Sequence, residues 1–160
     1  MNKITKLSVL LFVLLFSINA KANLGGYYYS AIHVEAVVHE NNTWEITERE
    51  DVFFTEPRHG VYRYIPYTFS LDVKNGKGEV TNKKYECKID DVEVSGSEYI
   101  TEDDNNNLVI RIGSEDELVT GAHTYIIKYK LSLPDDRTPD FDFIYTNILG
   151  ADMPAEINKF

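Results

Sequence analysis

The chain has 160 residues and a formal net charge of −10, with 26 acidic and 16 basic side chains. This balance argues against nucleic acid as a partner and against unaided binding to anionic lipid head groups, since both need clustered cations. The single cysteine, Cys87, excludes an intramolecular disulfide and a cysteine-based tetrahedral zinc site. Stability must therefore come from an apolar core.

The first predicted element is a secretory signal peptide over residues 1–22. A basic start precedes an apolar run from Leu7 to Ile18, and Ala20-Lys21-Ala22 fits a small-x-small cleavage site. The run has 12 residues, whereas a membrane-spanning helix needs about 20, so an uncleaved anchor is the less favoured alternative. Because residues 1–22 carry three lysines and no acid, residues 23–160 have a net charge of −13. We expect one exported domain, periplasmic or extracellular, with membrane association left open.

A long β-hairpin is predicted next. Residues 32–38 alternate apolar and polar side chains, Glu40-Asn41-Asn42-Thr43 is turn-like, and residues 44–54 form the return strand. Glu48 and Glu50 interrupt the apolar parity of that return strand.

The rest of the chain also has strand patterns. Pro66 cuts an aromatic run over 61–69, a turn or flexible loop is expected at 74–78, and Asp90-Asp91 marks a bulge where alternation changes parity. Further features are a polar loop at 102–107, strands at 108–112, 125–133 and 141–149, and at most one helical turn at 115–119. The pattern predicts an all-β fold, an antiparallel β-sandwich of immunoglobulin or fibronectin type, with an open β-barrel as the alternative.

Several short motifs together resemble a known family. They are Val52-Phe53-Phe54, Arg58-His59-Gly60-Val61-Tyr62-Arg63-Tyr64-Ile65-Pro66, Ile110-Arg111-Ile112-Gly113, Thr120-Gly121-Ala122-His123-Thr124-Tyr125-Ile126-Ile127-Lys128-Tyr129 and Asp142-Phe143-Ile144-Tyr145-Thr146-Asn147 followed by Pro154. In this order they resemble the extracytoplasmic N-terminal domain of domain-of-unknown-function family 2207, the YciQ-like predicted membrane proteins. The resemblance covers about Tyr28 to Phe160 and implies a fold and a location, but no chemistry.

Two departures from the family pattern bear on the ends of the domain. Tyr145-Thr146-Asn147 stands where the family usually has Trp before Asn, and the chain stops at Phe160 before the family's final strand and membrane helices. A truncated reading frame, a fragment and a free-standing exported form are all open. A missing edge strand would leave an open β-edge that invites pairing with another chain.

The best candidate contact site is the run from Arg58 to Arg63. Arg58, His59, Tyr62 and Arg63 could bind a ligand or partner, because guanidinium groups pair well with carboxylate or phosphate. The favoured alternative is structural: Gly60 permits a turn, Tyr62 or Tyr64 packs in the core, and Arg63 pairs with Glu48 or Glu50 on the acidic strand.

No metal, cofactor or catalytic residue is predicted. The four histidines lack zinc-ligand spacing, and the acidic loops lack the glycine and terminal glutamate of an EF-hand. Nucleophile-elbow patterns are absent from the sequence. The partner is unassigned, with another protein or membrane-embedded segments as candidates.

Three functions are weighed. The first is a non-catalytic exported domain of a membrane-protein family, acting as a sensor, scaffold or interaction module. The second is a free-standing carbohydrate-binding or adhesive module, which a contiguous exposed tyrosine platform would favour. The third, a hydrolase, would need a deep pocket that converges on His59 or His123.

Overall fold

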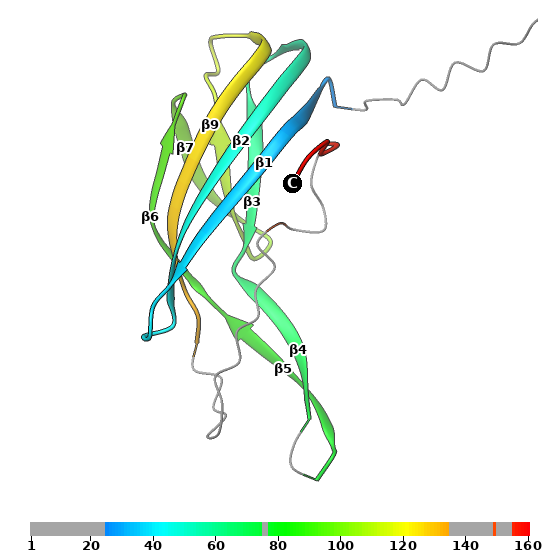
Figure 1. Cartoon of the computed structure of the whole chain (residues 1–160), viewed down its shortest axis with the longest axis vertical. Coiled ribbons are helices and arrows are strands. Elements are labelled where there is room, and N and C mark those ends of the chain that lie inside the picture. Colours follow the sequence, from blue (N-terminus) through cyan, green and yellow to red (C-terminus); the bar gives the residue numbers. More distant parts are fainter. Residues whose placement is uncertain (1–24, 75–76, 135–148, 150–154) are drawn as a thin grey trace, which may run out of the picture.

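The computed structural model describes residues 25–74, 77–134, 149 and 155–160, and it is built from antiparallel β-strands (Figure 1). No helix among these residues is long and apolar enough to cross a bilayer. The strands are β1 (Tyr27–Val38), β2 (Thr43–Arg58), β3 (Val61–Pro66), β4 (Thr68–Lys74), β5 (Val80–Glu86), β6 (Lys88–Ser95), β7 (Tyr99–Asp104), β8 (Asn107–Ile112) and β9 (Val119–Ser132).

The strands form three sheets. A four-stranded sheet has the order β1-β2-β9-β6, a three-stranded sheet has the order β3-β8-β7, and β4 pairs only with β5 among the described strands. No closed barrel forms in this part of the chain. The predicted all-β antiparallel fold is therefore confirmed.

The predicted hairpin is present as β1 and β2. The two strands pair from Tyr27↔Phe54 to Val38↔Trp44, and Asn42 at their turn has a φ of 59°, which Asn tolerates better than most residues. The inward face of β2 carries the apolar side chains and also Glu48 and Glu50, which are fully buried. Both acids thus occupy inward-facing positions in the alternation of the strand, and their side chains lie in the core.

Pro66 divides the aromatic run as predicted, because β3 ends at Pro66 and β4 starts at Thr68. The β4–β5 hairpin extends beyond the ends of the other strands as an arm (Figure 1). Phe69 and Tyr85 stack across its base, with ring centroids 5.4 Å apart. The arm therefore lies at the opposite end of β3 from the β2–β3 turn.

The bulge predicted at Asp90-Asp91 is confirmed. The pairing of β6 with β9 shifts between Asp90 and Glu93, and Asp91 has a φ of 53°. Two other expectations are wrong. Residues 102–104 belong to β7, which pairs with β8 through a tight turn at Asn105-Asn106. Residues 115–116 form a bend and 117–118 have no regular structure, so there is no helical turn before β9. The sequence did not reveal β7 as a strand, because its side chains are mostly exposed and its composition is polar like that of a loop.

One buried cluster unites the two larger sheets. It is formed by inward side chains of β1, β2 and β9 from the four-stranded sheet, together with Val61, Ile65, Ile110 and Ile112 from the three-stranded sheet. The alternation along β3 is strict: Val61, Arg63 and Ile65 are buried, whereas Tyr62 and Tyr64 are exposed. The expectation that Tyr62 or Tyr64 packs in the core is therefore wrong, because both occupy outward-facing positions of the strand. A single strand thus contributes both to the core and to the surface.

The last described residues lie along the edge of β1. The Tyr29 amide donates to the Glu156 carbonyl at 2.9 Å, and the Ile32 amide donates to the Lys159 carbonyl at 2.9 Å. The signal peptide predicted at 1–22 lies outside the described residues, as does nearly all of the strand predicted at 141–149.

Candidate functional site

The Arg58–Arg63 run divides between the interior and the surface. Arg63 leaves β3 on the core side and is 1% exposed. Its Nε and Nη2 donate to the two carboxylate oxygens of Glu48 at 2.7 and 2.8 Å, and Tyr129 Oη donates to Glu48 Oε1 at 2.7 Å. This bidentate pair joins the two larger sheets through the core, as the structural interpretation of Arg63 predicted. Arg63 does not reach the surface on which a partner would bind.

Glu50 lies beside this pair without a hydrogen bond of its own. Its Oε1 is 3.6 Å from Arg63 Nε, and neither of its oxygens has a hydrogen-bond partner among the described residues. Burial raises the pKa of Glu50 to about 7; Arg63 opposes this shift and Glu48 adds to it. Burial alone would lower the pKa of Arg63, but the adjacent Glu48 carboxylate raises it overall. The buried centre therefore holds two acids against one guanidinium.

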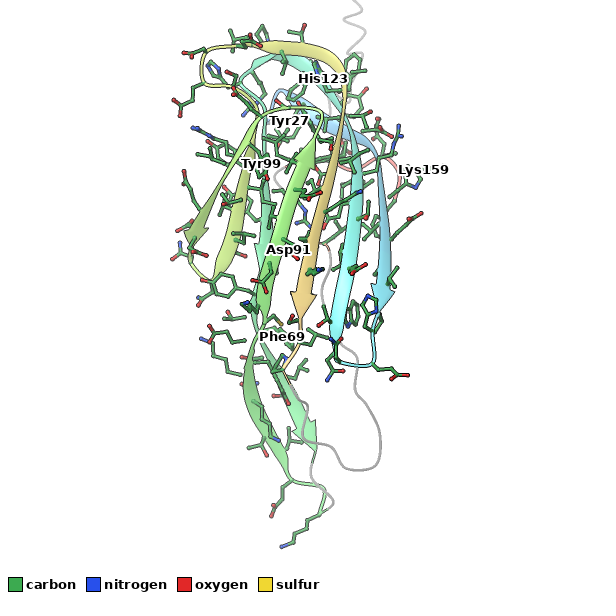
Figure 2. All side chains as sticks on the ribbon, turned by 90° about the vertical axis from the view of Figure 1, so that its left-hand side faces the viewer. Tyr27, Phe69, Asp91, Tyr99, His123 and Lys159 are labelled. Carbon is green, nitrogen blue, oxygen red and sulfur yellow. The ribbon has the colours of Figure 1, made fainter. Side chains whose placement is uncertain are left out.

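The other three candidate residues, Arg58, His59 and Tyr62, line a surface hollow of about 590 Å³. It lies at the β2–β3 turn and the end of β8, and its remaining lining includes Arg111, Glu115 and Leu118. Figure 2 labels Tyr27, Tyr99 and His123 at this end of the molecule, and Phe69 at the base of the arm.

Two glycines bring the backbones at the floor of the hollow together. Gly60 has a φ of 138°, and a Cβ there would lie 1.9 Å from the Ile112 carbonyl oxygen. Gly113 has a φ of 131°, and its Cβ would lie 1.9 Å from the His59 carbonyl oxygen. Only residues without a Cβ permit this reciprocal approach. The floor is consequently fixed by backbone contact rather than by side-chain packing.

His59 connects the rim of the hollow to its floor through contacts of its imidazole ring with backbone carbonyl groups. Its Nδ1 lies 3.2 Å from the Ser114 carbonyl oxygen and 3.1 Å from that of Glu117. Since both neighbours are acceptors, this geometry assigns the proton to Nδ1. Arg58 is engaged as well, because its Nη1 donates to the Gly25 carbonyl and its guanidinium lies 5.2 Å from the centroid of the Tyr27 ring. Both residues hold the hollow in shape.

The open side of the hollow is formed by Tyr62 and Arg111 on the outer face of β3 and β8, and Tyr64 lies beside it on the same face of β3, outside the lining. Tyr62 and Tyr64 are 45% and 38% exposed, and their rings stack with centroids 6.3 Å apart. Arg111 is the cross-strand partner of Tyr62, and its Nη1 forms an ion pair with Glu115. The Arg111 Nε is shielded from solvent and has no hydrogen-bond partner among the described residues. A ligand on this side of the molecule would therefore meet exposed tyrosine rings and a partly exposed guanidinium group.

A smaller hollow of about 250 Å³ lies on the far side of β8, between β8 and β7. It shares Arg111, Gly113, Ser114 and Glu115 with the first hollow, so Arg111 stands between the two. Sequence reasoning missed Arg111, Glu115 and Tyr64 as site residues. The alternation of the strand could have identified Arg111 as a surface residue, because Arg111 lies between two core isoleucines and must point outward.

No curated protein shows significant sequence similarity to this chain. Residues 28–160 match the family described as the predicted membrane protein (DUF2207) N-terminal domain. The match covers nearly all of the strands described above, from the start of β1 to the segment that lies along it. The chain therefore belongs to this family of predicted membrane proteins.

Proposed function

We propose that the domain is an exported, non-catalytic recognition module, a sensor or interaction domain that binds its partner at the hollow beside Tyr62. In this proposal the two larger sheets pack as a β-sandwich, and the recognition surface is one end and one outer face of it. The observation that best supports this proposal is the hollow itself. Backbone contact at Gly60 and Gly113 fixes its floor, while Tyr62 and Arg111 are open to a ligand. A preformed site of this kind loses little entropy on binding.

The chemistry of the lining supports binding rather than catalysis. A nucleophile needs a base within hydrogen-bond reach. Ser114 is the only serine, threonine or cysteine in the lining, and its Oγ accepts a hydrogen bond from the Asp116 amide. His59 directs Nδ1 to two carbonyl oxygens, not to that hydroxyl. A hollow that contains His59 is therefore insufficient support for a hydrolase.

A filling variant tests the proposal. Ser114→Trp places a large ring in the hollow, and Thr47→Trp is the matched control on the outer face of β2. The exported protein is applied to an array of oligosaccharides and peptides, with urea unfolding as the check that both variants fold. We expect array ligands of the wild type to be lost by Ser114→Trp and kept by Thr47→Trp. Equal binding by the two variants, or no bound ligand at all, would contradict the proposal.

Export and the lack of catalysis need separate tests. Intact mass of the exported protein should correspond to a start at Asn23, and a retained leader would contradict the predicted cleavage. Model esters, peptides and glycosides should show no turnover above buffer. Turnover by the wild type that His59→Ala abolishes would establish the hydrolase alternative instead.

A further inference from the structure

We propose that the ligand of this hollow is a neutral carbohydrate chain, whose sugar rings stack on Tyr62 in the hollow and on Tyr64 beside it, while Arg111 binds hydroxyl or ring oxygens. This inference rests on the proposed recognition function and names its ligand class. It starts from the tyrosine pair on the outer face of β3. Tyr62 and Tyr64 are alternate residues of one strand, their rings are tilted by only 29°, and both are more than one third exposed.

The pair is suited to an amphipathic ligand. Exposed tyrosines combine a flat apolar face with a polar hydroxyl, and such rings pack on surfaces that are apolar on one side and hydroxylated at their edges. Pyranose rings have this character. The surface continues from the tyrosines across β8 to Ile100, which is 42% exposed and faces Arg111 in the register of β7 with β8. The platform is therefore wider than one ring.

The charges around the platform favour a neutral ligand over an acidic one. Arg111 is already neutralised by Glu115, and the Arg58 guanidinium is held by the Gly25 carbonyl and the Tyr27 ring. The chain as a whole carries a net charge of −10, which disfavours a polyanion. The Arg111 side chain is 29% exposed where it lines the hollow, so an uncharged ligand oxygen can approach its guanidinium group there. Its Nε is enclosed by the protein and is not the point of contact.

A second aromatic pair provides the matched control. Tyr28 and Phe53 stack with centroids 5.5 Å apart on the outer face of the β1–β2 hairpin, in the other large sheet. That pair is not part of the lining of the hollow. Truncation of Tyr28 removes one ring of a stacked, partly exposed aromatic pair without touching the proposed site. If any exposed ring sufficed for binding, the two truncations would have equal effects.

The test uses the exported chain and neutral hexasaccharides of glucose, galactose, mannose and N-acetylglucosamine, with oligogalacturonate and polyglutamate as acidic probes. Calorimetric titration of wild type, Tyr62→Ala, Tyr64→Ala, Arg111→Gln and Tyr28→Ala gives the affinities. We expect at least one neutral hexasaccharide to bind, with a loss of about tenfold or more for the first three variants and no change for Tyr28→Ala.

Each other outcome overturns the inference. Absence of binding by all four neutral sugars at about 10 mM would exclude a carbohydrate as the ligand of this site. Equal losses of affinity in Tyr62→Ala and Tyr28→Ala would exclude it as well. Tighter binding of oligogalacturonate would mean an acidic ligand. Binding of peptides alone, lost in Ser114→Trp, would overturn the carbohydrate and leave the recognition function standing, whereas carbohydrate binding that Ser114→Trp leaves intact would overturn both.

Discussion

The two faces of β3 use the same kinds of side chain for opposite purposes. Inside, the Arg63 guanidinium meets Glu48 and Tyr129 in the buried core, where its Nε and Nη2 both donate to the Glu48 carboxylate. Outside, Arg111 meets Tyr62 and Glu115 at the wall of a hollow, and its side chain is partly exposed. Arginine, glutamate and tyrosine thus stabilise this fold where they are buried with their hydrogen bonds made. The same residue types are available to a ligand where they are half exposed.

The largest effect should come from the buried arginine. Arg63→Ala leaves Glu48 and Glu50 buried without a counter-charge, and we expect a loss of about 3–5 kcal/mol in the free energy of unfolding. Urea unfolding measures it, and Glu48→Ala with the double variant completes a cycle. Arg111→Ala is the surface counterpart and should leave the urea midpoint unchanged. Equal shifts for the two arginines would refute the distinction between the faces.

The glycine floor should be nearly as sensitive. Gly113→Ala places a Cβ 1.9 Å from a carbonyl oxygen, so the backbone must move, and we expect a loss of about 2–4 kcal/mol. Gly121→Ala is the control, because its φ is also positive, at +75°, but nothing lies within 4 Å of its Cβ. That control should cost about 1 kcal/mol, from backbone conformation alone. Thermal unfolding that ranks them in the reverse order would disprove the close approach.

Glu50 makes the stability depend on pH. Its pKa is raised by burial from 4.5 to about 7 in the folded protein, so folding favours the protonated acid. The contribution is complete below pH 4.5 and is lost as pH rises through 7, which lowers the free energy of unfolding by about 3 kcal/mol in total. Urea unfolding at pH 5 and 8 tests the sign. Glu50→Gln cannot titrate and should flatten the profile; a wild type that is more stable at pH 8 would contradict this sign.

The smallest effect concerns single hydroxyl groups. Tyr129→Phe removes the 2.7 Å hydrogen bond to the buried Glu48 carboxylate and should cost about 1.5–2 kcal/mol. Tyr64→Phe removes a hydroxyl from the exposed face and should leave the free energy of unfolding within about 0.5 kcal/mol of wild type. Urea unfolding of the two variants measures both effects. A larger loss of stability in Tyr64→Phe than in Tyr129→Phe would contradict this prediction.

Much of the fold could be predicted because each strand alternates with period two. The β1–β2 hairpin, the break at Pro66 and the bulge at Asp90-Asp91 all follow from local patterns. β7 could not be found in this way, since few of its side chains enter the core and polar residues look the same in an exposed strand and in a loop.

The site was predictable only in part, for a related reason. An acidic strand opposite an arginine was enough to predict the buried pair, because an unpaired charge in a core is too costly. The hollow arises from two glycines, Gly60 and Gly113, that lie far apart in the sequence and meet only in the folded chain. Local patterns carry no information on that encounter, so Arg111 and Glu115 became visible as site residues only in the structure.

One measurement tests the central claim that β3 is structural on its inner face and recognises a ligand on its outer face. Urea unfolding is followed for the wild type and the Tyr62→Ala/Arg111→Gln double variant, each with and without the neutral hexasaccharide that binds the wild type. We expect coincident midpoints without sugar, and a shift to higher urea with sugar for the wild type alone. A double variant that is markedly less stable without sugar, or equally stabilised by it, would show that β3 does not divide its two faces in this way.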